Sequence, residues 1–145
     1  MDFHVLGPVR VVAGSAAVEL ASGKQVALLG CLLIARGEVV SRDRLIDALW
    51  GERPPAAAVN ALQVHVHGLR RRLGAERIER EGPGYRLCLE RGELDLERFE
   101  LLVARGRSEL AGGEADAAAS TFREALGLWR GPAYEDVRYE AFAQA

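Results

Sequence analysis

The 145-residue sequence has few cysteines, few aromatic residues and no long apolar run. Cys31 and Cys88 lie in apolar helical and strand patterns, so we interpret both as small buried residues rather than metal ligands or a disulfide. No stretch reaches the run of about 18 apolar residues that indicates a membrane span. The first residues lack a basic segment followed by an apolar one, so we expect no secretory signal and a cytoplasmic location.

Motifs for catalysis are also missing from the sequence. It has no Ser/His/Asp arrangement with usable spacing, no glycine-rich phosphate loop and no suitably placed carboxylate pair. His65 and His67 are two residues apart on a predicted helix, which separates them by about 200° around its axis, so they cannot share one metal ion. We therefore expect no enzyme, no metal and no cofactor.

Charge is unevenly distributed along the chain, although the net charge is only −2. Residues 1–90 carry twelve basic and ten acidic side chains, a balance of +2, whereas residues 91–145 carry seven and eleven, a balance of −4. This division favours two parts with different partners.

Short strands and helices alternate in the first part of the chain. Turns at Gly7-Pro8 and Gly14-Ser15 separate three predicted strands, at residues 3–6, 9–12 and 17–20. Ser22 and Gln25 form a predicted capping box at the start of a helix over residues 23–35. A second helix is expected to begin after Ser41 and to end at Gly51.

The longest helix of this part is predicted over residues 56–73, after the stiff Pro54-Pro55 turn. Spacings of three and four residues give it one apolar stripe, formed by Val59, Leu62, Val66, Leu69 and Leu73. At 100° per residue, an outward row lies within about 40° of the face opposite Leu62; it consists of Asn60, Val64, His67 and Arg71, with Gln63 and Arg70 beside it. Amide, apolar, imidazole and guanidinium groups suit the major groove of DNA. The alternative is a core helix with a solvated basic end.

A hairpin is predicted after this helix, with strands at residues 78–80 and 85–89 and a corner at Gly82-Pro83-Gly84-Tyr85. We expect Gly84 to adopt a backbone conformation that other residues resist. A helix pair followed by such a hairpin predicts an α+β winged helix-turn-helix with an N-terminal antiparallel sheet.

The pattern changes to all-helical after Gly92. Helices are predicted over residues 95–111 and 114–129, joined by Gly112-Gly113, with a third segment from about Tyr134. Ala118, Phe122 and Ala125 recur at the spacing of a tetratricopeptide-type (TPR-like) hairpin, and Gly106 would allow its two helices to cross closely.

The order and spacing of these motifs resemble the Streptomyces antibiotic regulatory protein (SARP) family. In the first part the matching stretches are Val5-Leu6-Gly7-Pro8-Val9, Gly23-Lys24-Gln25, Ala48-Leu49-Trp50-Gly51, Asn60-Ala61-Leu62-Gln63, Leu69-Arg70-Arg71-Arg72-Leu73-Gly74 and Gly82-Pro83-Gly84-Tyr85. In the second part they are Asp95-Leu96 with Arg98-Phe99, Leu128-Trp129 and Arg130-Gly131-Pro132.

This resemblance implies a response-regulator-type winged helix over residues 1–91 and the opening helices of a bacterial transcriptional activator domain over residues 92–145. It implies an activator of secondary-metabolite (antibiotic) biosynthetic gene clusters that binds direct repeats near promoters and contacts RNA polymerase. A homodimer on DNA is a further expectation. The alternative is a protein-interaction module built on a degenerate winged helix and TPR-like helices.

Three groups of residues are expected to meet double-stranded DNA. The base-facing group is Asn60, Val64, His67 and Arg71. The residues expected at DNA phosphates are Trp50, Gln63, Arg70 and Arg72. The Trp50 ring nitrogen would reach the backbone while the ring packs in the core; the alternative is that Trp50 serves core packing alone. The wing group is Arg80, Gly82, Gly84, Tyr85 and Arg86. Glu81 stands where the family usually has arginine, so we expect the wing to contribute little affinity and Arg80 to point away from Glu81.

Overall fold

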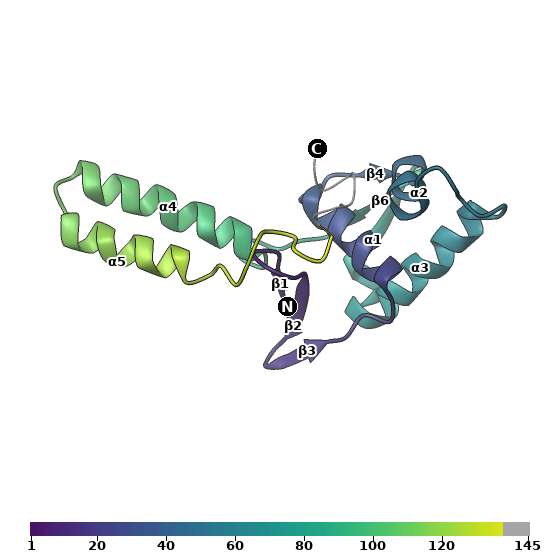
Figure 1. Ribbon diagram of the computed structural model, residues 1–145, viewed down its shortest axis with the longest axis horizontal. Coiled ribbons are helices and arrows are strands. Elements are labelled where there is room, and N and C mark those ends of the chain that lie inside the picture. The colour runs from purple at the N-terminus through teal and green to yellow at the C-terminus, as the bar shows by residue number, and fades with distance from the viewer. Residues whose placement is uncertain (138–145) are drawn as a thin grey trace.

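The structure is a computed structural model that describes residues 1–137. A small N-terminal sheet and a group of helices with a second sheet form one body, from which a pair of antiparallel helices projects (Figure 1). No helix among the described residues is long and apolar enough to cross a membrane.

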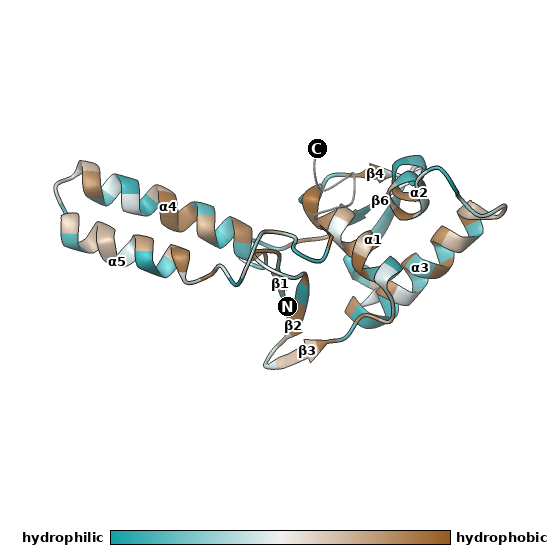
Figure 2. Ribbon diagram, viewed as in Figure 1, coloured by the Kyte–Doolittle hydropathy of each residue, from teal (hydrophilic) through white to brown (hydrophobic). Residues whose placement is uncertain are grey.

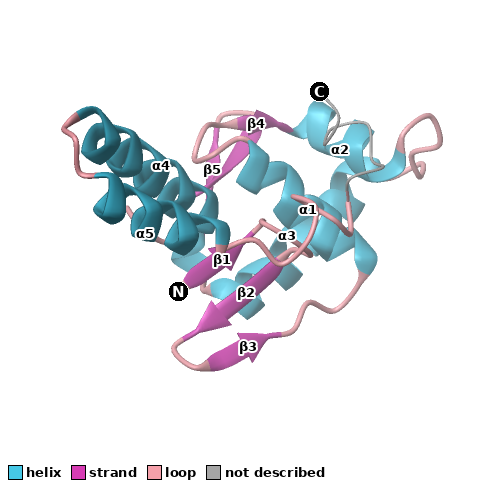
Figure 3. Ribbon diagram, turned by 60° about the vertical axis from the view of Figure 1, so that its left-hand side comes forward, coloured by secondary structure: helices cyan, strands magenta, loops and turns pink. Residues whose placement is uncertain are grey.

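The N-terminal sheet has three antiparallel strands in the order β1 (Asp2–His4), β2 (Arg10–Ala13) and β3 (Ala16–Val18) (Figure 3). The predicted strands are confirmed, but β1 ends earlier than expected. The reason is that the N–H groups of Val5 and Leu6 donate to the side chain of Asp95, at 2.8 and 3.1 Å, instead of to a neighbouring strand.

Three helices follow: α1 (Gly23–Ile34), α2 (Arg42–Trp50) and α3 (Ala58–Leu73). The Ser22 and Ser41 hydroxyls cap α1 and α2, as the sequence predicts. The reciprocal half of the α1 capping box differs from expectation, because Gln25 Oε1 accepts from the N–H of Ala21 and not of Ser22. Helix α3 begins two residues later than predicted, and no side chain caps its start.

The core of this part is formed by α1 and the inward faces of α2 and α3. On α3 the buried residues are Leu62, Val66, Leu69 and Leu73. Gly68 allows α3 to approach α1 closely, because a Cβ at this position would lie 2.5 Å from Nε2 of the buried Gln25. The packing therefore fixes which face of α3 points outward.

A second sheet, in the order β4-β6-β5, closes the winged helix. A 3₁₀ turn, η1 (Ala75–Arg77), leads from α3 into β5 (Ile78–Glu81), which pairs with β6 (Gly84–Leu87); β4 (Val40–Ser41) lies on the other side of β6. The expected backbone role of Gly84 is wrong, because it is Gly82 that has a positive φ, +58°. Gly84 is needed instead for close packing: a Cβ there would lie 2.6 Å from the carbonyl oxygen of Val40.

The helical pair consists of α4 (Asp95–Ala111) and α5 (Ala115–Leu126). Apolar and polar residues alternate along α4 (Figure 2). The two helices cross closely at Gly106, where a Cβ would lie 2.5 Å from the Phe122 ring, so the predicted role of this glycine is confirmed. Of the expected third segment, residues 134–137 are described and the remainder lies outside the described residues.

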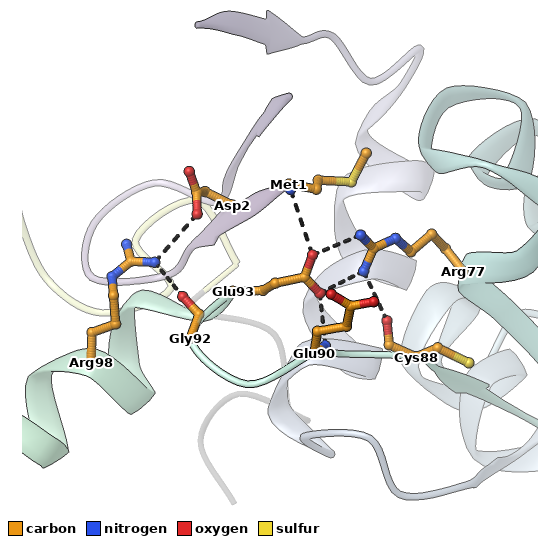
Figure 4. Close-up of polar contacts among 8 residues, drawn as sticks. All are labelled: Met1, Asp2, Arg77, Cys88, Glu90, Gly92, Glu93 and Arg98. Carbon is orange, nitrogen blue, oxygen red and sulfur yellow. Dashed lines mark hydrogen bonds and ion pairs between the residues drawn. The ribbon is translucent and has the colours of Figure 1, made fainter. Parts of the chain in front are cut away.

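The helical pair is joined to the winged helix through hydrogen bonds and ion pairs. Glu93 forms two contacts with the guanidinium of Arg77, at 2.5 and 2.6 Å, and accepts from the N–H of Glu90 (Figure 4). Arg98 bridges the Gly92 carbonyl and Asp2. Because these contacts join η1, the linker and α4, they hold the base of the wing against the start of the helical pair.

Candidate nucleic-acid interface

The outward face of α3 carries an exposed row of chemically mixed side chains. All four predicted base-facing residues are exposed, while four residues of the predicted apolar stripe are buried; the exception is Val59, near the start of α3, which is 38% exposed. The side chain of Val64 is 68% exposed, an unusual position for a β-branched apolar residue in a helix. A thymine methyl group would cover it in the major groove. Together with Asn60, His67 and Arg71, the row offers amide, imidazole and guanidinium groups for base edges.

Three arginines end α3, and the structure separates their roles. Arg71 and Arg72 are exposed and belong to no ion pair among residues 1–137. Arg70 is half-buried: its Nε and Nη2 donate to the Ile78 carbonyl at 3.0 and 2.9 Å, and its guanidinium lies 5.9 Å from the centre of the Tyr85 ring. The predicted phosphate role therefore does not fit Arg70, which joins α3 to the wing.

Trp50, at the end of α2, is half-buried and packs against the core. Its ring centre lies 5.9 Å from that of His65, and Lys24 Nζ lies 5.7 Å from it. Lys24 also donates to the Leu49 carbonyl, at the end of the same helix. Core packing of Trp50 is thus observed, and a phosphate contact by its ring nitrogen stays a prediction.

The two faces of the wing hairpin differ in charge. Arg86 Nη2 contacts Glu79 at 2.7 Å and its Nε lies 3.6 Å from Glu81, so this face is neutralised by two carboxylates. Hydrogen bonding to Arg86 lowers the pKa of Glu79, and the same bond raises the pKa of Arg86. A DNA contact by Arg86 would have to break these pairs. The family-like wing role therefore fits Arg86 poorly.

Arg80 lies on the other face of the hairpin, as the alternation of strand side chains predicts. It lines a pocket with Arg42 and Gln63, beside the glycine-cornered turn. Arg42, the first residue of α2, is a candidate that our sequence analysis missed. The sequence shows only that Arg42 follows the Ser41 cap, between a strand and a helix. It does not show that the hairpin, which is remote in sequence, lies beside Arg42.

The two neighbouring histidines have different surroundings. His65 is half-buried next to Trp50, whereas His67 is exposed on the outward row. Within residues 1–137, no group of three or more His, Cys, Asp or Glu side chains is placed to hold a metal ion.

Three packed helices, an exposed reading face on the third and a hairpin beside it define the winged helix-turn-helix class of DNA-binding folds. Residues 16–87 match the family described as "Transcriptional regulatory protein, C terminal", and residues 94–145 match "Bacterial transcriptional activator domain". With both matches in this order, the chain belongs to the SARP family of transcriptional regulators.

Named relatives agree with this assignment. The regulatory protein AfsR of Streptomyces griseus is 38% identical over 94% of this chain and 14% of its own length. The regulatory protein DnrI of Streptomyces peucetius is 34% identical over 94% of this chain and 54% of its own. The solved structure of Mycobacterium tuberculosis EmbR in complex with a low-affinity phosphopeptide superposes with a TM-score of 0.92 at 34% identity, over 99% of this chain and 39% of that one. The chain thus spans about half or less of the length of these relatives.

Proposed function

We propose that this chain is the DNA-binding part of a transcriptional activator of a secondary-metabolite gene cluster, with α3 reading the major groove of double-stranded DNA. The single observation that carries the proposal is the outward row of α3. Its base-facing side chains are exposed together, opposite the buried Leu62, Val66, Leu69 and Leu73, and the exposed Val64 has no folding reason to be there. Membership of the SARP family supports the same reading.

The two parts of the chain would have different partners. Residues 1–91 would bind direct repeats near promoters, as a homodimer on DNA. Residues 92–145 would open the activator domain, through which the longer protein would contact RNA polymerase. The site of action would be the cytoplasm, where bacterial promoters lie. The relatives are named as regulators rather than as enzymes.

A selection of bound DNA from a pool of random duplexes tests the proposal. We expect one motif to be enriched and to bind with salt-dependent affinity, because phosphate contacts release counterions. A titration of the enriched duplex against a scrambled one measures the specificity. If no motif is enriched and no duplex binds at low salt, DNA recognition is excluded.

One observation favours a second function, a protein-interaction module. Large apolar side chains are exposed on the helical pair and just after it. Leu101, Leu110 and Leu126 are 59, 56 and 66% exposed, and Trp129, which follows α5, is 39% exposed. The double variant Leu110→Ser/Leu126→Ser separates the two functions. If the protein reads DNA, the double variant should keep the affinity of the wild type for the selected duplex. If it is an interaction module, the wild type should bind no duplex, and the double variant should lose the protein partner.

A further inference from the structure

A cleft of about 410 Å³ lies where α1 packs on α3, close to the end of α3 (Figure 1). Ala21 and Gln25 line it from the beginning of α1, and Gly68, Arg71 and Arg72 line it from the last turns of α3. Its volume falls in the range of small-molecule sites, about 300–1,000 Å³. We call it the α1–α3 cleft.

Gln25 is the buried polar residue of the cleft, and it is only 6% exposed. Its Oε1 accepts from the N–H of Ala21 at 2.8 Å, which fixes the orientation of the amide and turns Nε2 toward α3. Nε2 donates to no acceptor within residues 1–137, and no fully buried side-chain atom of this part of the chain lacks a partner, so Nε2 reaches the open space of the cleft. The amide therefore holds an unused hydrogen-bond donor ready for a ligand.

Gly68 makes room for this amide. A Cβ at Gly68 would lie 2.5 Å from Gln25 Nε2, so any other residue would displace the NH₂ group or the helix. Glycine destabilises a helix interior relative to alanine, yet it occupies this position within α3. A residue that weakens its own helix in favour of a polar group is typical of a functional site.

Two guanidinium groups give the cleft its charge. Arg71 and Arg72 are exposed, and among residues 1–137 no carboxylate lines the cleft and neither arginine forms an ion pair. A guanidinium donates through a planar fork that matches the oxygens of a phosphate. Two forks and one NH₂ group suit a phosphate with three free oxygens, as a phosphate monoester has. A phosphodiester has only two free oxygens, and its second substituent hinders contact with a buried amide.

We propose that Gln25, Arg71 and Arg72 bind the terminal phosphate of a small phosphorylated metabolite, and that the bound metabolite excludes DNA. The second part rests on the proposed function, which places Arg71 at the bases. Because one guanidinium cannot serve both ligands, the metabolite lowers the affinity for the duplex, and by linkage the duplex lowers the affinity for the metabolite by the same factor. DNA binding thereby responds to the concentration of the metabolite.

Binding of a phosphate monoester without DNA is the first test. Glycerol phosphate should shift the NMR signal of the Gln25 NH₂ group, whereas glycerol and the phosphodiester glycerophosphocholine should not. Gln25→Glu keeps an oxygen for the Ala21 N–H but loses the NH₂ donor, so its affinity for glycerol phosphate should fall by at least about tenfold. Arg107→Gln, at an exposed arginine of α4, is the control and should bind as the wild type does. Circular dichroism melts check folding, and Arg72→Gln replaces Gln25→Glu if the latter does not fold.

Competition with DNA is the second test. Glycerol phosphate should weaken binding of the selected duplex by the wild type, relative to potassium chloride at the same ionic strength, and should not weaken binding by Gln25→Glu. If the wild type binds the duplex but the Gln25 signal does not shift, or shifts equally with glycerophosphocholine, the cleft is overturned and the proposed function stands. A shift without competition overturns the exclusion of DNA. A shift in a wild type that binds no duplex overturns the proposed function and leaves the cleft in place.

Discussion

Arg70, Arg71 and Arg72 follow one another at the end of α3, yet they meet different surroundings. Arg70 turns back to the Ile78 carbonyl and the Tyr85 ring, while Arg71 and Arg72 extend into solvent. Whether a side chain is available for DNA depends on the partners that it already has within the protein. The same argument separates Arg80, which has no ion pair within residues 1–137, from Arg86, which is paired with Glu79.

Arg71 should read a base. If it contacts a guanine edge, Arg71→Ala should cost about 1–3 kcal/mol and relax preference at one position of the selected motif. Arg72→Ala is the matched control, expected to weaken all sequences alike. Binding measured against single-base variants of the duplex distinguishes them, and unchanged preference in folded Arg71→Ala would remove Arg71 from the reading row.

Arg70 should support the fold more than DNA binding. Arg70→Ala removes two hydrogen bonds to the buried Ile78 carbonyl, so the free energy of unfolding should fall by about 1–3 kcal/mol. Urea unfolding measures this, with Arg72→Ala expected to be near neutral. If the two variants are equally stable, Arg70 again becomes a candidate for a contact with a DNA phosphate.

Glu81 should matter less for DNA than its place in the motif implies. It lies with Arg86 on the face of the hairpin opposite Arg80, so Glu81→Arg would place a new cation beside Arg86. We expect a gain in affinity of below about 1 kcal/mol, which salt screens. Titration at low and moderate salt checks this, and a larger gain confined to sites flanked by A/T pairs would show that this face reaches the minor groove.

At the scale of elements, periodicity predicted which helices and strands form, because the apolar stripe of α3 and the serine caps of α1 and α2 are local signals. The ends of the strands and the roles of single residues depend on contacts with residues that are remote in sequence. Strand β1 stops where Asp95, about ninety positions away, takes its N–H groups. The sequence predicts a special backbone conformation at Gly84, but the structure needs glycine there because β4 packs too close for a Cβ. Arg42 lies beside Arg80 only because the hairpin folds back onto the start of α2.

The crossing of α4 and α5 should not tolerate a side chain at Gly106. A methyl group there would overlap the Phe122 ring, so Gly106→Ala should lower the free energy of unfolding by about 1–3 kcal/mol despite the better helix propensity of alanine. The control is Gly112→Ala, whose nearest contact would be an ordinary 3.5 Å. Urea unfolding compares the two, and equal stability would contradict the close crossing.

At the scale of the whole molecule, the two parts share a continuous junction. Asp95 at the start of α4 is buried against the loop after β1. The segment after α5 also contacts this loop, where the N–H of Arg130 donates to the Leu6 carbonyl at 2.7 Å. The two parts on either side of the proposed boundary near residue 91 are therefore in direct contact. Arg77 and Glu93 join the base of the wing to the segment that leads into α4.

The junction should weaken in acid. Hydrogen bonding to Arg77 lowers the pKa of Glu93 below its ordinary value of 4.5, so the folded state favours the carboxylate. Its stabilisation is fully present above pH 4.5 and is lost as the pH falls through the lower folded pKa. The difference in unfolding free energy between wild type and Glu93→Gln should be constant near neutral pH and shrink in acid. A difference that does not change with pH would contradict this role.

The central claim is that the outward row of α3 enters the major groove, and methylation protection on the selected duplex tests it most directly. Guanine N7 lies in the major groove, so bound protein should protect N7 positions within the motif from dimethyl sulfate. In the Arg71→Ala complex, at protein concentrations that saturate the duplex, protection of one guanine should be lost while the others remain. A saturated complex in which every N7 stays reactive would show that the protein binds only the backbone, and that α3 does not read the bases.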